Sequence, residues 1–151
     1  MTDYTKIIDC GQNTGPHHVE LDQWIDCSPF ERLLNMTIHE AADGRALLSM
    51  PFCFEYAQGA GLMHGGAVVS LADTAVGMAI KSLLAPGTRF ATTHMQNEFL
   101  RPVLSGTITA EARVVEQEGR NLKGSATVYN ADGKEVMRFT SVFRKARQQR
   151  Q

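Results

Sequence analysis

Between Glu55 and Lys81 the chain carries one charged side chain, Asp73, apart from His64, and this stretch constrains the fold more than any other. Its apolar residues recur with helical spacing, in one stripe of Val68, Ala72, Ala75, Ala79 and Leu83 and a neighbouring row of Val69, Val76 and Ile80. The spacing predicts a helix of about 20 residues, roughly 30 Å long, that ends before Pro86. Because apolar residues surround most of its circumference, this helix needs cover on nearly all sides.

The helical stretch does not suit a membrane span, because residues 57–80 are interrupted by Gln58, His64, Ser70, Asp73 and five glycines. With 43% hydrophobic and 21% charged residues among 151, the chain has the composition of one globular domain and is neither disordered nor collagen-like. We predict a lead-in of unknown role at residues 1–20, a single domain at 21–145 and a polar tail at 146–151. No contact with a membrane is expected.

Shorter patterns flank the helix. Ser28 to Glu31 matches a capping box, in which serine accepts from the first-turn amides and glutamate reaches back, and predicts a short helix to about Leu34. Alternation on either side of the turn Ala42-Asp43-Gly44 predicts a hairpin. Later segments with alternating residues predict antiparallel strands at 89–100, 106–118, 122–131 and 135–145. The expected fold is α+β, a long antiparallel sheet wrapped around one central apolar helix.

Charge and cysteine content exclude several classes of protein. Fifteen lysines and arginines against sixteen acids give a formal charge of -1, so there is no overall basic field to hold nucleic acid. Cys10, Cys27 and Cys53 are odd in number and far apart, which favours neither a disulfide framework nor a cysteine metal site. We expect no metal and no cofactor. Since the N-terminus lacks the apolar core of a signal peptide, the expected compartment is the cytoplasm.

Asp73 is the first candidate catalytic residue. A buried carboxylate is costly unless it is paired or hydrogen-bonded, and small neighbours one turn away, such as Ser70 and Gly77, leave room for a ligand. The alternative is an aspartate that hydrogen-bonds a facing chain. His64-Gly65-Gly66 precedes the same helix, and its first amides, at the positive end of the helix dipole, can hold a polarised carbonyl oxygen. A tight turn braced by His64 would explain this tripeptide equally well.

A composite motif resembles the hot-dog-fold acyl-CoA thioesterases, specifically the phenylacetyl-CoA (PaaI-type) and 4-hydroxybenzoyl-CoA thioesterase group. The motif consists of Gln58-Gly59-Ala60-Gly61-Leu62-Met63-His64-Gly65-Gly66-Ala67, then Leu71-Ala72-Asp73-Thr74-Ala75, then Phe99-Leu100-Arg101-Pro102. The resemblance extends from about Pro29 to Arg144. It implies a hot-dog fold and an acyl-CoA thioesterase that releases free acid and CoA from an aryl- or medium-chain acyl-CoA.

The resemblance also implies roles for single residues. The Gly65 amide would polarise the thioester carbonyl, while Asp73 of the facing subunit attacks it or activates water. Gln58 matches a family position whose side-chain amide orients the water or the carbonyl. Thr92, or Thr93 beside it, matches a hydroxyl residue that contacts the water or the pantetheine arm. A shared site and a helix that needs cover predict a homodimer, paired into a homotetramer.

For coenzyme A, the resemblance points to two places. One is Arg101 with Pro102, after the strand that follows the helix, and the other is the turn Gly119-Arg120-Asn121, with Arg144 or Lys145 as further candidates. Scattered basic residues of this kind are also ordinary solvated surface. The acyl group stays open, because an aryl or a medium-chain pocket could equally be lined by Phe52, Phe54, Met63, Met78 and Phe90.

Other functions fit the sequence less well. The glycine spacing around Gly59 and Gly61 breaks the dinucleotide-binding fingerprint, and neither a serine-hydrolase elbow nor a P-loop occurs. Two alternatives remain within the expected fold. One is a hydratase or dehydratase, although the surroundings of His64 do not match its motifs. The other is a non-catalytic acyl-CoA-binding module, which would gain nothing from a nearly buried carboxylate at Asp73.

Overall fold

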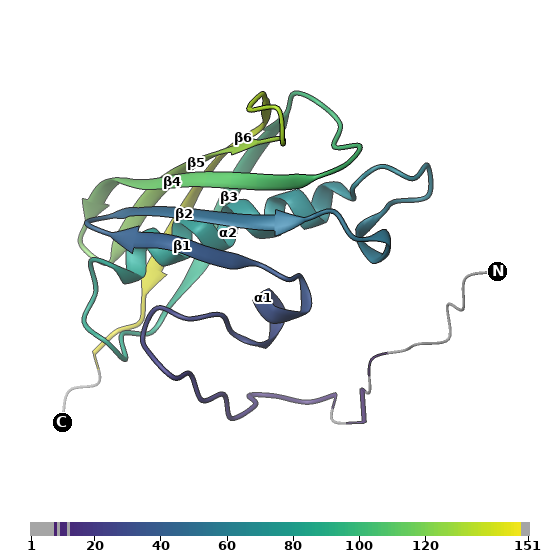
Figure 1. The fold of residues 1–151 in the computed structure, drawn as a ribbon. Coiled ribbons are helices and arrows are strands. Elements are labelled where there is room, and N and C mark those ends of the chain that lie inside the picture. Colours follow the sequence, from purple (N-terminus) through teal and green to yellow (C-terminus); the bar gives the residue numbers. More distant parts are fainter. Residues whose placement is uncertain (1–7, 9, 12, 149–151) are drawn as a thin grey trace.

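The computed structural model describes residues 8, 10, 11 and 13–148 (Figure 1). Parts of the predicted lead-in and tail, namely residues 1–7, 9, 12 and 149–151, lie outside this range. The elements in chain order are α1 (Pro29–Leu33), β1 (Thr37–Ala42), β2 (Arg45–Pro51), the 3-10 turn η1 (Phe54–Tyr56), α2 (Gly65–Lys81), β3 (Phe90–Phe99), β4 (Thr107–Glu118), β5 (Asn121–Tyr129) and β6 (Glu135–Lys145).

The strands form one antiparallel sheet in the order β1-β2-β4-β5-β6-β3. The sheet curves around α2, which lies along its inner face (Figure 1). The predicted α+β architecture is therefore confirmed. The strand after the helix, β3, does not join the meander beside β4. It lies at the sheet edge against β6, where Phe99 pairs with Met137 and Phe90 with Lys145.

The core lies between α2 and the inner face of the sheet. Alternate residues of β4 point inward, and Ile108, Ala110 and Ala112 are buried there, as the alternation predicts. The helix lies very close to β5 at Gly124, where an added Cβ atom would lie 2.3 Å from a methyl carbon of Val76. Gly124 is thus required by packing within the chain itself.

One stripe of α2 is less covered than the rest. Ser70, Asp73, Gly77 and Lys81 follow each other at helical spacing and are half-buried, whereas the other faces of the helix are largely buried. The helix is also shorter than predicted, with 17 residues. Leu83 continues the apolar stripe in sequence, but it lies in the turn beyond the helix and is 47% exposed.

The N-terminal region is fastened to the far end of α2. The Trp24 indole N–H donates to the Lys81 carbonyl (3.0 Å), and the Lys81 ammonium donates to the Trp24 carbonyl (2.9 Å) and lies 4.5 Å from the centre of its ring. We call these three contacts the Trp24–Lys81 clasp. It holds the segment that leads into α1 against the end of α2.

The short helix α1 forms where the capping box predicts it, but the box is wrong in detail. Ser28 makes no side-chain hydrogen bond to the first-turn amides. Its hydroxyl instead donates to the Glu31 carboxylate. Two side chains that were each expected to cap the backbone therefore bind each other.

Candidate active site

Asp73 lies at the middle of α2, on the less covered stripe. Its Oδ1 accepts a hydrogen bond from the Thr92 hydroxyl (2.9 Å), and it forms no ion pair with any described residue. Burial raises the pKa of Asp73, the Thr92 hydrogen bond partly opposes that rise, and the nearby negative charge of Glu31 adds to it. A half-buried carboxylate without a cation has the environment of a nucleophile or a general base.

A β-bulge in β3 decides which of two adjacent threonines reaches Asp73. The register with β6 shifts between Thr92 and His94, so Thr92 faces inward to Asp73. Thr93 is exposed and its hydroxyl donates to the carbonyl of Val142. Of the two candidate residues, Thr92 is therefore the one in contact with the carboxylate.

Removal of this contact has a predictable effect on pH dependence. Thr92→Val deletes a hydrogen bond that lowers the pKa of Asp73, so we expect the acid limb of the activity profile to move to higher pH. A lost hydrogen bond to a charged group costs roughly 1.5 kcal/mol, which corresponds to about a tenfold lower kcat. The pH profile of kcat tests this, with Thr93→Val as the matched control. An acid limb that stays in place would contradict the assignment.

The amide of Gly65 is the first N–H group of α2. Gly65 is the first residue of α2, and its N–H has no hydrogen-bond acceptor among the described residues. His64 caps the helix, with Nδ1 accepting from the Gly66 N–H at 2.8 Å. His64 therefore braces the turn, and the cap leaves the preceding amide, that of Gly65, unoccupied at the positive end of the dipole.

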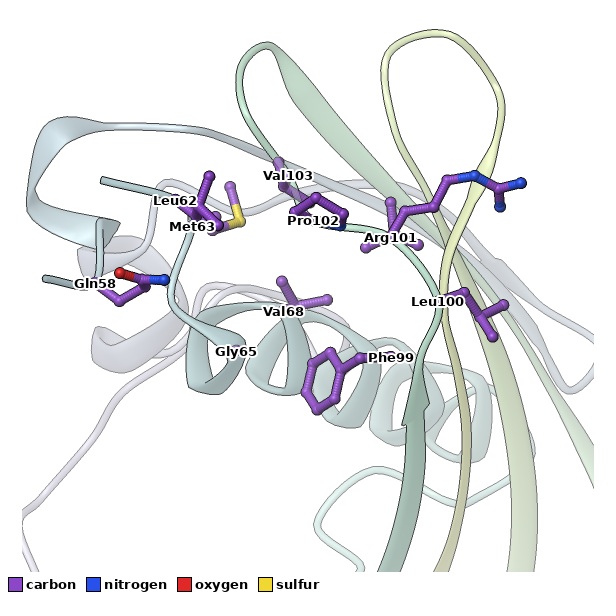
Figure 2. Close-up of a pocket in the computed structure, with 11 residues that line it drawn as sticks. Gln58, Leu62, Met63, Gly65, Val68, Phe99, Leu100, Arg101, Pro102 and Val103 are labelled. Atoms are coloured by element: carbon purple, nitrogen blue, oxygen red, sulfur yellow. The ribbon is translucent and has the colours of Figure 1, made fainter. Parts of the chain in front are cut away.

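A cavity of about 370 Å³ adjoins this helix end (Figure 2). Its wall is mostly apolar and is formed by Gln58, Leu62, Met63, Gly65, Val68, Phe99, Leu100, Arg101, Pro102, Val103 and Val136. The Phe99 ring lies so close to Gly65 that an added Cβ atom would be 3.2 Å from it. A side chain at position 65 would therefore require the Phe99 ring to shift by a few tenths of an ångström.

Two further lining residues have partners of their own. The Gln58 carbonyl oxygen accepts from the Ala60 N–H within the loop, so its NH₂ group is the part able to bind a ligand. Arg101 extends away from the cavity in Figure 2, and its guanidinium donates to the Glu135 carbonyl (2.7 Å). In this arrangement Arg101 presents its side chain at the rim of the cavity.

The predicted CoA contacts fall at opposite ends of the sheet. Arg101 and Pro102 follow Phe99, which pairs with Met137, whereas Asn121 pairs with Arg144. Seven residues of strand separate these positions along β6, or roughly 23 Å. The two groups of predicted contacts therefore cannot bind the same phosphates within one chain.

The turn at Gly119 to Asn121 belongs to a basic end of the sheet. The Arg120 guanidinium donates to the Lys145 carbonyl (3.3 Å), and both residues line a cavity of about 510 Å³. Desolvation lowers the pKa of Arg120, and the positive charges of Arg144 and Arg147 lower it further. A concentration of cations of this kind attracts anions such as phosphates.

The sequence did not point to Glu31 as part of this site. Its only sequence signal was the capping box, yet its charge raises the pKa of Asp73.

The five residues considered for the acyl pocket do not lie around one cavity. Met63 lines the cavity near Gly65, Met78 is in the core, Phe52 is half-buried against the core, Phe54 is exposed, and Phe90 packs on Phe143 with ring centres 5.7 Å apart.

Comparison with known proteins identifies a family model and related sequences that match this chain. The family model of the thioesterase superfamily matches residues 60–137, which include Gly65, Asp73, Thr92 and Arg101. A candidate esterase of Halobacterium salinarum is 30% identical over 100 residues, which cover 63% of this chain and 66% of that protein. A second candidate esterase, from Saccharolobus solfataricus, is 25% identical and is covered over 73% of its length.

Solved structures agree in fold. A conserved protein of Pseudomonas aeruginosa superposes with a TM-score of 0.76 and 28% identity, over 80% of this chain and 95% of that one. The PaaI protein of the phenylacetic acid degradation operon of Escherichia coli gives a TM-score of 0.72 and 28% identity, over 78% and 84%. The six-stranded antiparallel sheet around one main helix matches these structures, and the predicted hot-dog fold is confirmed.

Proposed function

The chain belongs to the thioesterase superfamily, a family of thioester hydrolases, and on that premise we propose that it hydrolyses aryl- or medium-chain acyl-CoA thioesters. The observation that carries the proposal is Asp73, a half-buried carboxylate with a raised pKa whose one hydrogen-bond partner among the described residues is the Thr92 hydroxyl. Burial of such a charged group lowers the free energy of unfolding, and the other buried residues of this helix are apolar. Its oxygen can attack the thioester carbonyl carbon or take a proton from an attacking water.

The unoccupied amide of Gly65 supplies the second element of the proposed mechanism. It would donate to the carbonyl oxygen, where negative charge develops as the attacking oxygen adds to the carbon. The carbon–sulfur bond then breaks, CoA leaves as the thiolate, and the acyl group ends as the free acid. His64 keeps the helix end in place, and the Gln58 amide and Thr92 hydroxyl are suited to orient the carbonyl or the water.

Two chains are needed to assemble this site. Gly65 and Asp73 are eight residues apart on one straight helix, or roughly 12 Å along its axis. One carbonyl group cannot touch both, since each contact must be about 3 Å. We therefore propose that Gly65 of one subunit works with Asp73 of the other.

The free edge of β3 is the surface that suits this pairing. Residues 93–99 of β3 are all exposed, although the strand is bonded to β6 along its other edge. An unpaired edge of this length is a template for another strand. A second copy of β3, paired antiparallel and centred on Gln96, would set Thr92 opposite the partner's Phe99, because the bulge after Thr92 adds one residue to that half of the strand. Because Thr92 holds Asp73 and Phe99 covers Gly65, that register joins the two halves of the site.

The same two-fold pairing also accounts for the divided CoA contacts. It would bring the end of β3, with Arg101 and Pro102, to the basic end of the partner's sheet, where the partner's Gly119, Arg120 and Asn121 lie. One CoA molecule could then bind basic residues of both subunits. A homotetramer formed from two such dimers stays a prediction.

The three free thiols, Cys10, Cys27 and Cys53, fit the proposed cytoplasmic compartment. Among the described residues, no helix has the length and apolarity needed to cross a membrane.

Arginine substitutions should separate affinity from turnover. Phosphate contacts far from the reacting carbon bind substrate and transition state alike, so Arg120→Ala and Arg101→Ala are expected to raise KM with kcat nearly unchanged. Loss of one charged contact corresponds to roughly a tenfold rise in KM. Arg113→Ala, on the outer face of β4, is the control. If Arg120→Ala leaves KM for acyl-CoA as it was, the proposed phosphate site is wrong.

The proposed function itself is tested by thiol release. Purified protein is incubated with a panel of acyl-CoAs and a thiol reagent, and free CoA is expected for at least one of them. A non-catalytic binding module would bind without releasing thiol, and a hydratase or dehydratase would change the acyl chain and keep the thioester intact. Single turnover in oxygen-18 water then distinguishes the two roles of Asp73, because an acyl-aspartyl intermediate leaves label in its carboxylate.

A further inference from the structure

Gly77 is a glycine in the interior of α2, where helix propensity argues against it. Glycine in a helix interior is about 1 kcal/mol less favourable than alanine. Its backbone is ordinary helix and needs no left-handed conformation. A glycine in such a place therefore calls for a reason in its surroundings.

Packing within the chain does not supply that reason. A Cβ atom added at Gly77 would meet only the ring edge of Phe143, at 3.8 Å, which is an ordinary van der Waals contact. Gly124 is the contrasting case, because its added Cβ atom would lie 2.3 Å from Val76. An alanine methyl group thus fits at position 77 of the free chain but not at position 124.

The place that a side chain at position 77 would take lies beside the candidate catalytic carboxylate. Gly77 is four residues after Asp73, on the same half-buried stripe and about 6 Å further along the axis. Phe143, which faces this place, pairs with Thr92, the residue that holds Asp73. Phe90 packs on Phe143, so the wall is aromatic.

We infer that Gly77 sets the size of the acyl group, by leaving space for a bulky apolar tail that extends from the reacting carbon along α2 toward Phe143. This inference rests on the proposed function. An apolar aromatic wall suits the acyl part of the substrate, whereas the phosphates of CoA require the cations elsewhere in the site. A tail about 6 Å long corresponds to an arylacetyl or a six-carbon acyl group. The enzyme should therefore prefer such thioesters to acetyl-CoA.

The test compares Gly77→Ala with the wild type on acetyl-CoA, hexanoyl-CoA and phenylacetyl-CoA. We expect the ratio of kcat/KM for the better bulky thioester over acetyl-CoA to fall at least tenfold. We also expect Tm to rise by roughly 2–4 °C, because alanine favours the helix. Thr74→Ala is the control, since it also improves helix propensity but removes volume next to Asp73, and its ratio should not fall.

Each other outcome has a distinct meaning. A ratio that stays within twofold while Tm rises would show that the substrate does not use the space. An equal loss for all three thioesters, together with loss of the dimer in light scattering, would assign the space to the second subunit instead. A wild-type enzyme that hydrolyses acetyl-CoA alone would overturn the inference and leave the proposed function standing. A wild-type protein that hydrolyses none of the three, or any acyl-CoA of the wider panel, would overturn both.

Discussion

Asp73→Asn is expected to lower kcat by roughly 10²-fold or more, the effect of removing a positioned general base, and by more if Asp73 is the nucleophile. Each tenfold loss corresponds to about 1.4 kcal/mol of barrier. The amide is close in size to the carboxylate, so the packing of α2 should survive. It can neither take a proton from water at neutral pH nor attack the thioester with a charged oxygen. Thiol release measured under saturating acyl-CoA gives the change in kcat.

The stability of the Asp73→Asn variant should change in the opposite direction from its kcat. Burial raises the pKa of Asp73, so the folded protein favours its protonated form. The resulting penalty is absent below the pKa of the unfolded chain and grows as pH rises through the pKa of the folded state. Asparagine carries no such penalty. The variant should therefore be at least as stable as the wild type at neutral pH, and this advantage should shrink on acidification, as melting curves at several pH values would show.

A matched control for this substitution lies in the first hairpin. Asp43 is exposed in the turn between β1 and β2 with φ of 52°, a conformation that asparagine tolerates. Asp43→Asn makes the same chemical change and should keep full activity. The catalytic reading of Asp73 would end if a well-folded Asp73→Asn enzyme kept more than about half of its activity. A purely structural Asp73 predicts lowered stability with near-normal kcat.

Met95→Glu is expected to dissociate the dimer and to abolish nearly all activity. Met95 is 39% exposed on β3 and lies next to the two-fold axis of the proposed pairing. The substitution would place two like charges close together across that axis, where water is largely excluded. Each monomer would then hold Gly65 and Asp73 too far apart for one carbonyl, so kcat should fall about as far as in Asp73→Asn. Light scattering and thiol release on the same preparation measure both effects.

Val115→Glu is the comparison for this variant. Val115 is 47% exposed on β4, so it also changes an exposed apolar strand residue to an acid, but it lies away from the β3 edge. It should remain dimeric and active. A fully active monomer, whether wild type or Met95→Glu, would refute the shared site.

Local signals in the sequence were sufficient for most of the fold. The turn at Asp43 and Gly44 has positive φ angles of 52° and 75°, the kind of turn that those residue types favour, so the hairpin could be predicted. The long helix followed from apolar spacing alone, but its end did not. Leu83 keeps the spacing, whereas Ser82 ends the helix with a hydroxyl that donates to the Ala79 carbonyl.

Features that depend on contacts distant in sequence were beyond prediction. Alternation shows that residues 90–99 form a strand, but it does not show that the strand pairs with β6. The bulge after Thr92, which sends that hydroxyl to Asp73 and Thr93 elsewhere, leaves no mark in the residue pattern. The wide separation of Arg101 and Arg120 follows from the same register.

The Trp24–Lys81 clasp gives the protein a built-in optical reporter. Trp24 is the only tryptophan in the sequence, so all indole fluorescence comes from the point where the N-terminal segment meets the end of α2. An ammonium group over the ring and a carbonyl at the indole N–H set its emission. Release of that segment would change both at once. Undocking of the N-terminal segment and unfolding of the domain could thus be followed separately, without a label, by comparing emission with circular dichroism.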